Sequence, residues 1–105
     1  MKRDKIRIRD LRALYARQGG KCAYTGADLT PETASLDHMT PLCRDGDHTI
    51  SNLAIVLTSV NIAKGTMTYP EFLALCRDVA RHSQAGAAPG GVHFNGECDR
   101  GLFND

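Results

Sequence analysis

The sequence predicts a small α+β domain in which two short strands, separated by a loop, are followed by a helix and flanked by further helices. Three observations predict this class. Apolar residues recur at helical spacing over residues 8–18, and two short apolar runs bounded by turn residues lie at 34–39 and 51–57. A strong helix-start signal lies at residues 68–71. A chain of 105 residues can form one modest core and is too short for two.

The first expected element is an amphipathic helix over residues 8–18. Its apolar side chains recur at helical spacing, and the Gly19-Gly20 pair tolerates positive φ, which favours the end of a helix. Residues 21–24 favour a short strand, and Thr25-Gly26 favours the turn of a knuckle-like hairpin. The N-terminal third is therefore expected to be a helix followed by a hairpin.

The central segment favours two strands joined by a loop. The loop contains Pro41 and the turn-rich run Arg44-Asp45-Gly46-Asp47. After the second apolar run, residues 58–65 contain few helix breakers and end at Gly65, which predicts a short helix. The expected order is strand, loop, strand, helix.

Another helix is expected to begin near Thr68. Thr68 is a good N-cap, Pro70 fits the first turn, and Glu71 completes a capping box. From residue 83 onward glycine and proline are frequent and no periodicity is evident. One domain is therefore expected over residues 1–82, with a mostly irregular tail over residues 83–105.

Charge is unevenly distributed along the chain. The net charge is +1, yet residues 1–21 hold eight Lys or Arg against two Asp, a net +6, and the remainder carries −5. A basic arm and helix suit contact with phosphates, with Arg9 and Arg12 as candidates, although a solvated helix face explains the same pattern. No apolar run is long enough for a membrane span and no export signal is evident, so a cytoplasmic location and no membrane partner are expected.

One ordered set of polar residues carries the chemistry. Asp37-His38 lies in a predicted strand, Asn52 follows fourteen residues after His38, and Asn61 and Lys64 share one face of the expected helix. Each is commonplace alone. The order and spacing of the set, in the runs Ser35-Leu36-Asp37-His38-Met39-Thr40-Pro41, Gly46-Asp47-His48-Thr49-Ile50-Ser51-Asn52-Leu53 and Asn61-Ile62-Ala63-Lys64-Gly65, resemble the HNH endonuclease family.

The similarity extends from about Leu11 to Ala80 and includes Cys22-Ala23-Tyr24-Thr25-Gly26 and Pro70-Glu71-Phe72. The resemblance implies a ββα-metal core with one divalent ion, usually Mg²⁺, for which Mn²⁺ or another divalent ion can substitute. It implies cleavage of DNA, expected to be double-stranded, with 5′-phosphate and 3′-hydroxyl products. By analogy with compact family members, a phage or mobile-element setting with larger machinery is expected.

The resemblance also implies roles for individual residues. His38 matches the general base, and Asn52 matches the asparagine that fixes the loop and the orientation of the histidine. Asp37 and Asn61 match the metal ligands. Because Asn61 stands at the third position of the motif, the chain is an HNN variant. The chemistry asks for the same types: a neutral imidazole can accept a proton from water near pH 7, and hard oxygen donors suit Mg²⁺. Lys64, Arg44 and His48 are expected to contact nucleic acid, the last two with an ordinary surface role as the alternative.

Two points depart from the simple pattern. Adjacent strand residues face opposite sides, so Asp37 and His38 can serve one phosphate only if the strand bends or ends there. Many family members also have two CxxC pairs that bind zinc, and here the matching positions are Cys22, Thr25, Leu57 and Val60. Structural Zn²⁺ is therefore not expected, with apolar packing in its place, although a site formed by Cys22, Cys43 and a histidine is an alternative.

Two further hypotheses stay open at this stage. The first is a ββα module that binds nucleic acid, or another protein, without cutting it. The second is an enzyme of the same fold that cleaves RNA.

Overall fold

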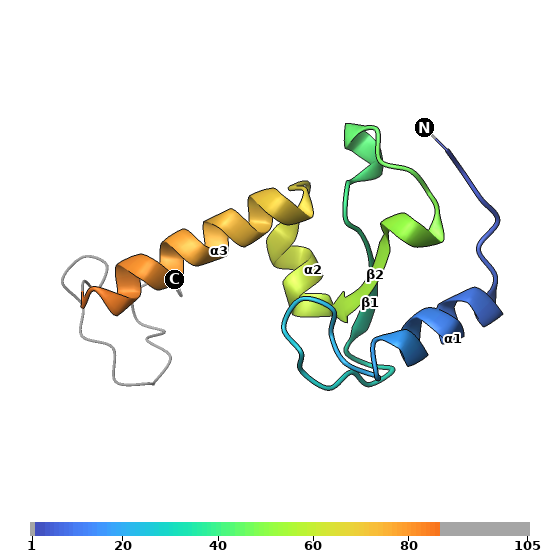
Figure 1. Ribbon diagram of the computed structural model, residues 1–105, viewed down its shortest axis with the longest axis horizontal. Coiled ribbons are helices and arrows are strands. Elements are labelled where there is room, and N and C mark those ends of the chain that lie inside the picture. The colour runs from blue at the N-terminus through green and yellow to red at the C-terminus, as the bar shows by residue number, and fades with distance from the viewer. Residues whose placement is uncertain (1, 87–105) are drawn as a thin grey trace, which may run out of the picture. The chain divides into compact units, whose positions relative to one another are not determined.

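The computed structural model describes residues 2–86 and places all of the predicted site residues in one compact unit (Figure 1). The chain divides into Met1–Leu73 and a second unit, Ala74–Asp105. The tail expected at residues 83–105 lies mostly outside the described part, and the domain boundary expected after residue 82 stays a prediction. No helix in the described part is both long and apolar enough to cross a bilayer.

A two-stranded antiparallel sheet forms the centre of the first unit. β1 (Ala34–His38) pairs with β2 (Leu53–Leu57), and the register sets Asp37 opposite Ala54. The connection contains two short 3₁₀ turns, η1 (Leu42–Arg44) and η2 (Ile50–Asn52). β2 begins later than expected because residues 50–52 turn before the strand starts. The predicted order of strand, loop, strand and helix is confirmed, and the fold is a mixed α+β arrangement consistent with a ββα core.

Two helices flank this hairpin on different sides (Figure 1). α1 (Ile8–Arg17) packs on β2, and α2 (Thr58–Lys64) contacts both strands. At the end of α1, the Gln18 side chain pairs with β2 like an added strand residue: its Nε2 donates to the Ile55 carbonyl at 2.8 Å, and its Oε1 accepts the Ile55 N–H at 3.0 Å. The buried edge of β2 therefore keeps its polar groups satisfied.

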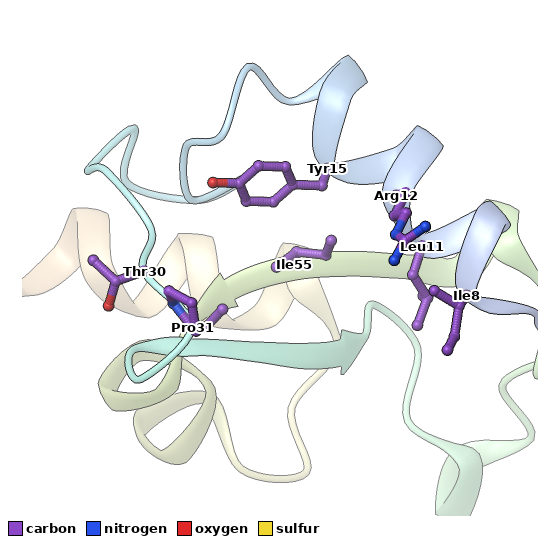
Figure 2. A pocket seen from close by; sticks show the side chains of 8 residues that line it. Ile8, Leu11, Arg12, Tyr15, Thr30, Pro31 and Ile55 are labelled. Carbon is purple, nitrogen blue, oxygen red and sulfur yellow. The ribbon is translucent and has the colours of Figure 1, made fainter.

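An open apolar groove lies between α1 and the sheet. Figure 2 shows Leu11 and Ile8 of α1 extending toward the strands, with Ile55 of β2 beneath the helix. The segment that carries Thr30 and Pro31 closes one end of the groove near Tyr15. The apolar repeat of the first helix is thus only partly covered, and Ile8 is 68% exposed.

The core lies on the other face of the hairpin, beneath the knuckle formed by residues 21–29. Cys22 and Leu29 of the knuckle pack with Ala54 and Val56 of β2. The short strand expected at residues 21–24 is wrong: only Lys21 forms a strand-like bridge there, to Asp28. The Cys22 N–H donates to the Ala27 carbonyl and the Gly26 N–H to the Cys22 carbonyl, so a tight turn uses the groups that a strand would need.

α3 (Tyr69–Gln84) begins as the sequence predicts. The Thr68 N–H donates to Glu71 Oε1 at 3.0 Å, and the Glu71 N–H donates to Thr68 Oγ1 at 3.3 Å, which is a reciprocal capping box. The Tyr69 N–H also donates to the Met39 carbonyl at 2.8 Å, so the start of α3 is attached to the chain just after β1.

Candidate active site

Asn52 closes the loop that follows β1. Its Oδ1 accepts the Thr40 N–H at 2.9 Å, and its Nδ2 donates to the carbonyls of Thr40 at 2.9 Å and Asp47 at 2.8 Å. One amide therefore joins the turn just after His38 to the residue just before His48. The side chain acts on the backbone of the loop, which fits the loop-fixing role that the resemblance implies.

Gly46 allows the same loop to fold tightly on itself. Its N–H donates to the Pro41 carbonyl at 2.9 Å. A Cβ atom built at Gly46 would lie 1.8 Å from the Thr40 carbonyl oxygen, so any side chain there would have to displace backbone. The loop is consequently held from both ends, by Gly46 and by Asn52.

His38 and His48 meet at the end of β1. Nε2 of His38 lies 3.0 Å from Nδ1 of His48, and the ring centroids are 5.2 Å apart. The His48 backbone is paired with the N-terminal arm: its N–H donates to the Lys2 carbonyl at 2.7 Å, and its carbonyl accepts the Asp4 N–H at 2.8 Å. The backbone that carries the His48 ring is therefore fixed, and Nδ1 of His38 is not engaged by His48.

The environment of His38 favours the neutral imidazole. Partial burial lowers the pKa of His38 below its usual 6.5, and the positive charge that His48 can carry lowers it further. Asp37 opposes this effect but does not reverse it. At neutral pH the His38 ring is therefore available as a proton acceptor.

Asp37 points the opposite way, into the core, and both of its oxygens have donors. The Tyr24 hydroxyl donates to Oδ2 at 2.5 Å, and the Lys64 ammonium lies 3.3 Å from Oδ1. Burial raises the pKa of Tyr24, and its hydrogen bond to the Asp37 carboxylate raises it further, so this hydroxyl is a fixed donor. Tyr24 is in turn stacked on Tyr69, with ring centroids 4.6 Å apart.

Lys64 is fully buried, which differs from the surface position expected for it. Its ammonium contacts Asp37 and donates to the His38 carbonyl at 3.1 Å, and its side chain is 0% exposed. The helical spacing from Asn61 is as predicted, but α2 packs that face on β1 instead of presenting it to solvent. In this arrangement the Lys64 ammonium is not available to contact nucleic acid.

Asn61 lies beside the same strand. Its Nδ2 donates to Ser35 Oγ at 2.8 Å and to the Leu36 carbonyl at 3.3 Å. These bonds orient the amide, and they leave Oδ1 as the atom with metal-ligand character. Ser35 and Asp37 alternate onto one face of β1, so Asn61 and Asp37 flank the same stretch of strand.

The residues at this face fit a hard divalent cation in their chemistry. The Lys64 ammonium contacts two oxygens there, one from the Asp37 carboxylate and one from the His38 carbonyl, so positive charge is already accommodated beside Asp37. Within residues 2–86 no group of three or more His, Cys, Asp or Glu converges, so the protein donors there are one carboxylate and one amide oxygen. Such a sparse set suits Mg²⁺, which retains several waters.

Asp37 and His38 face opposite sides of β1, as expected for adjacent strand residues. Asp37 is 5% exposed and faces the core, whereas the His38 ring reaches His48 on the other side of the strand. β1 ends at His38, and Thr40 with Pro41 begins the loop. The two side chains are therefore brought to the last turn of one strand but not onto one face.

The other candidates for nucleic-acid contact occupy varied positions. Arg44 is exposed and forms a two-pronged ion pair with Glu71, in which one Nη lies 3.1 Å from Oε2. Arg9 and Arg12 are exposed on α1, and Arg12 also lines the apolar groove. His48 is partly buried against His38. Of these four candidates, only Arg9 and Arg12 are exposed and form no side-chain hydrogen bond or ion pair within residues 2–86.

Of the positions that match the zinc pairs, Cys22 and Thr25 lie in the knuckle, Leu57 ends β2 and Val60 lies in α2. Cys22 is 3% exposed, and its Sγ accepts the Leu57 N–H at 3.3 Å. Leu57 and Tyr24 pack around the same core cluster. Cys22, Cys43 and Cys76 are free thiols, and Cys43 is exposed. Apolar contacts therefore join the knuckle to β2 at these positions.

Sequence reasoning missed two partners. The Tyr24 hydroxyl donates to Asp37, and His48, expected at a nucleic-acid contact or in an ordinary surface role, contacts His38. A signal for Tyr24 was present, because a tyrosine among apolar knuckle residues needs a partner for its hydroxyl when it is buried. Nothing in the spacing of His48 predicts its partner, because the loop path depends on Gly46 and Asn52.

Comparison with protein-family models matches residues 22–69 to a family described as HNH endonuclease. The matched segment contains the knuckle, both strands, the intervening loop and α2. A search of curated proteins finds no match.

Proposed function

We propose that this chain is a metal-dependent DNA endonuclease in which His38 is the general base and Asp37 with Asn61 holds the divalent ion, since residues 22–69 match a family described as HNH endonuclease. The match supports a nuclease, and hence a hydrolase that acts on nucleic acid; nucleases of this family generally use divalent metal ions. The observation that carries the proposal is the position of the His38 imidazole at the end of β1, where its Nε2 lies 3.0 Å from Nδ1 of His48 and its Nδ1 is not engaged by that ring.

The reaction needs a proton acceptor beside the scissile phosphate. His38 accepts one proton from a water molecule through Nδ1, the water oxygen forms a bond to phosphorus, and the bond from phosphorus to the 3′ oxygen breaks. The leaving 3′ oxygen takes a proton and becomes a hydroxyl, while the phosphate stays on the 5′ end. Asn52 keeps the loop closed around His38 throughout, through its bonds to Thr40 and Asp47.

Asp37 and Asn61 would hold the divalent ion with their oxygens. When bound, the ion supplies charge stabilisation for the phosphate and its leaving oxygen. Mg²⁺ is the proposed ion because both donors are hard oxygens, and Mn²⁺ would be an effective substitute. Tyr24 orients the carboxylate through Oδ2, and the Lys64 ammonium lies 3.3 Å from Oδ1.

The basic arm and α1 are proposed to contact the backbone of double-stranded DNA. Arg9 and Arg12 are exposed there, and residues 1–21 carry a net +6. Phosphate contacts of this kind position a duplex without reading its sequence, so weak sequence preference is expected. A role within larger phage or mobile-element machinery rests on family analogy alone.

The test is digestion of supercoiled plasmid, with structured and single-stranded RNA in parallel reactions. The proposal predicts nicked plasmid with Mg²⁺ or Mn²⁺ and intact plasmid after chelation with EDTA. If RNA is cleaved while the plasmid stays intact, the substrate is RNA and not DNA. If the protein binds nucleic acid but cleaves none with several divalent ions, the enzyme proposal is rejected and the chain is a non-catalytic nucleic-acid-binding module.

A further inference from the structure

We propose that His48 is a positioning residue for His38: its Nδ1 accepts a hydrogen bond from His38 Nε2–H and so keeps the lone pair on Nδ1 of His38, the atom that takes the proton from water. The inference rests on the proposed function in one respect, which is that His38 acts as a base. The geometry that carries it is the 3.0 Å separation of the two nitrogens.

A neutral imidazole carries one N–H and one lone pair, so one ring of the pair must donate and the other accept. If His48 donated, the His38 proton would lie on Nδ1, and His38 would have no lone pair left for water. If His38 donates, Nδ1 is free to accept. Only the second arrangement is compatible with a base, and it also sets the His48 proton on its own Nε2.

The bond also persists through the reaction. When His38 accepts a proton on Nδ1, its Nε2–H remains and becomes a donor on a cation, and hydrogen bonds to charged groups are roughly twice as strong as neutral ones. A neutral His48 therefore keeps the same hydrogen bond before and after proton transfer, without itself gaining or losing a proton. A neutral imidazole takes the place that a carboxylate holds beside the histidine in other hydrolases.

His48 is held where it can do this by three separate backbone contacts. Its N–H and carbonyl pair with Lys2 and Asp4 of the N-terminal arm, and the Asp47 carbonyl just before it accepts from Asn52. The Lys2 N–H in addition donates to Asp47 Oδ1 at 2.6 Å. The backbone that carries the His48 ring is therefore held by several contacts, and the N-terminal arm is part of that support.

The experiment compares His48→Leu, His48→Asn and the control His82→Asn, an exposed histidine of α3. Asn carries its amide oxygen at the position of Nδ1, so it can still accept, whereas Leu cannot. With plasmid as substrate, we expect His48→Leu to lower kcat about 10- to 100-fold with KM nearly unchanged, as the loss of a hydrogen bond to a charged group implies. We expect His48→Asn to recover most of that loss and His82→Asn to match the wild type.

Nitrogen NMR of the His38 ring in the wild-type protein gives an independent readout without substrate. Protonation at Nε2, with slow exchange of that proton, supports the proposal. An Nδ1–H tautomer overturns it, as does a His48→Leu protein that folds and cuts like the wild type, or a His48→Asn protein as slow as His48→Leu. If no nucleic acid is cleaved at all, the proposed function fails, while the tautomer measurement still decides the pairing.

Discussion

The ammonium of Lys64 lies 3.3 Å from the Asp37 carboxylate in the interior, with the two side chains 0% and 6% exposed. A buried pair of this kind loses much of its attraction to desolvation, but removal of one partner leaves an uncompensated charge. Lys64 also donates to the carbonyl of His38, so the pair links α2 to the end of β1. Substitution of Lys64 and Asp37, singly and together, measures what this ion pair contributes to folding.

Lys64→Met is expected to cost about 3–5 kcal/mol in the free energy of unfolding, because Asp37 would keep only Tyr24 as a partner. The double variant Asp37→Asn with Lys64→Met should be more stable than Lys64→Met alone, since no buried charge remains. Urea unfolding of both variants measures this. Lys21→Met removes an exposed partner of Asp28 and serves as the control. Strictly additive effects of the two substitutions would contradict the pairing.

Gly46→Ala should destabilise the loop that carries His48. The added Cβ would meet the Thr40 carbonyl oxygen, and relief of such overpacking costs about 1–3 kcal/mol. Thermal unfolding reports the loss of stability, and the NMR signals of His38 report displacement of the loop. A Gly46→Ala protein with wild-type stability and an unchanged His38 environment would show that the close approach is not a constraint.

The start of α3 gives a prediction about acid stability. The ion pair with Arg44 and the Thr68 N–H lower the pKa of Glu71 to about 2 from the ordinary 4.5. A lowered carboxyl pKa contributes stability above the unfolded value, and the contribution is lost as pH falls from about 4.5 toward 2. The stability difference between the wild type and Glu71→Gln should therefore shrink over that range in urea unfolding. A difference that stays constant with pH would refute the assignment, and Asp78→Asn, in an exposed pair, is the control.

The activity should depend on pH through His38. Burial and His48 lower its pKa below 6.5, so the neutral base predominates at pH 7 and is lost as pH falls through the lowered value. A profile of kcat/KM against pH should show an acidic limb centred below 6.5. A limb centred above 6.5 would mean that another group, or a stabilised imidazolium, controls the rate.

The sequence predicts the elements well where local chemistry decides them. The strand and helix order from Ala34 to Lys64 follows apolar runs and breakers, and the capping box at Thr68 forms as expected. The knuckle differs, because a tight turn closed by Gly26 outweighs the strand tendency of residues 21–24. Such competition between a turn and a strand is settled by contacts with Leu29 and Val56, which lie far apart in sequence.

The candidate site is predictable as a set of residues but not as a set of contacts. Helical spacing correctly sets Lys64 on the face of Asn61, yet whether that face meets solvent or β1 depends on how α2 packs. The pairing of His48 with His38 similarly depends on a loop closed by Asn52. Both cases involve packing between elements, which a single sequence does not encode in its local pattern.

The most direct test of the account is the rate at which His38→Ala nicks supercoiled plasmid in the presence of Mg²⁺, beside the wild type and the control His82→Ala. If His38 is the base, His38→Ala should keep its fold and its affinity for DNA but lose at least about 100-fold in rate, the usual contribution of a general base. The control should cut like the wild type. A folded His38→Ala protein that nicks at the wild-type rate would contradict the central claim.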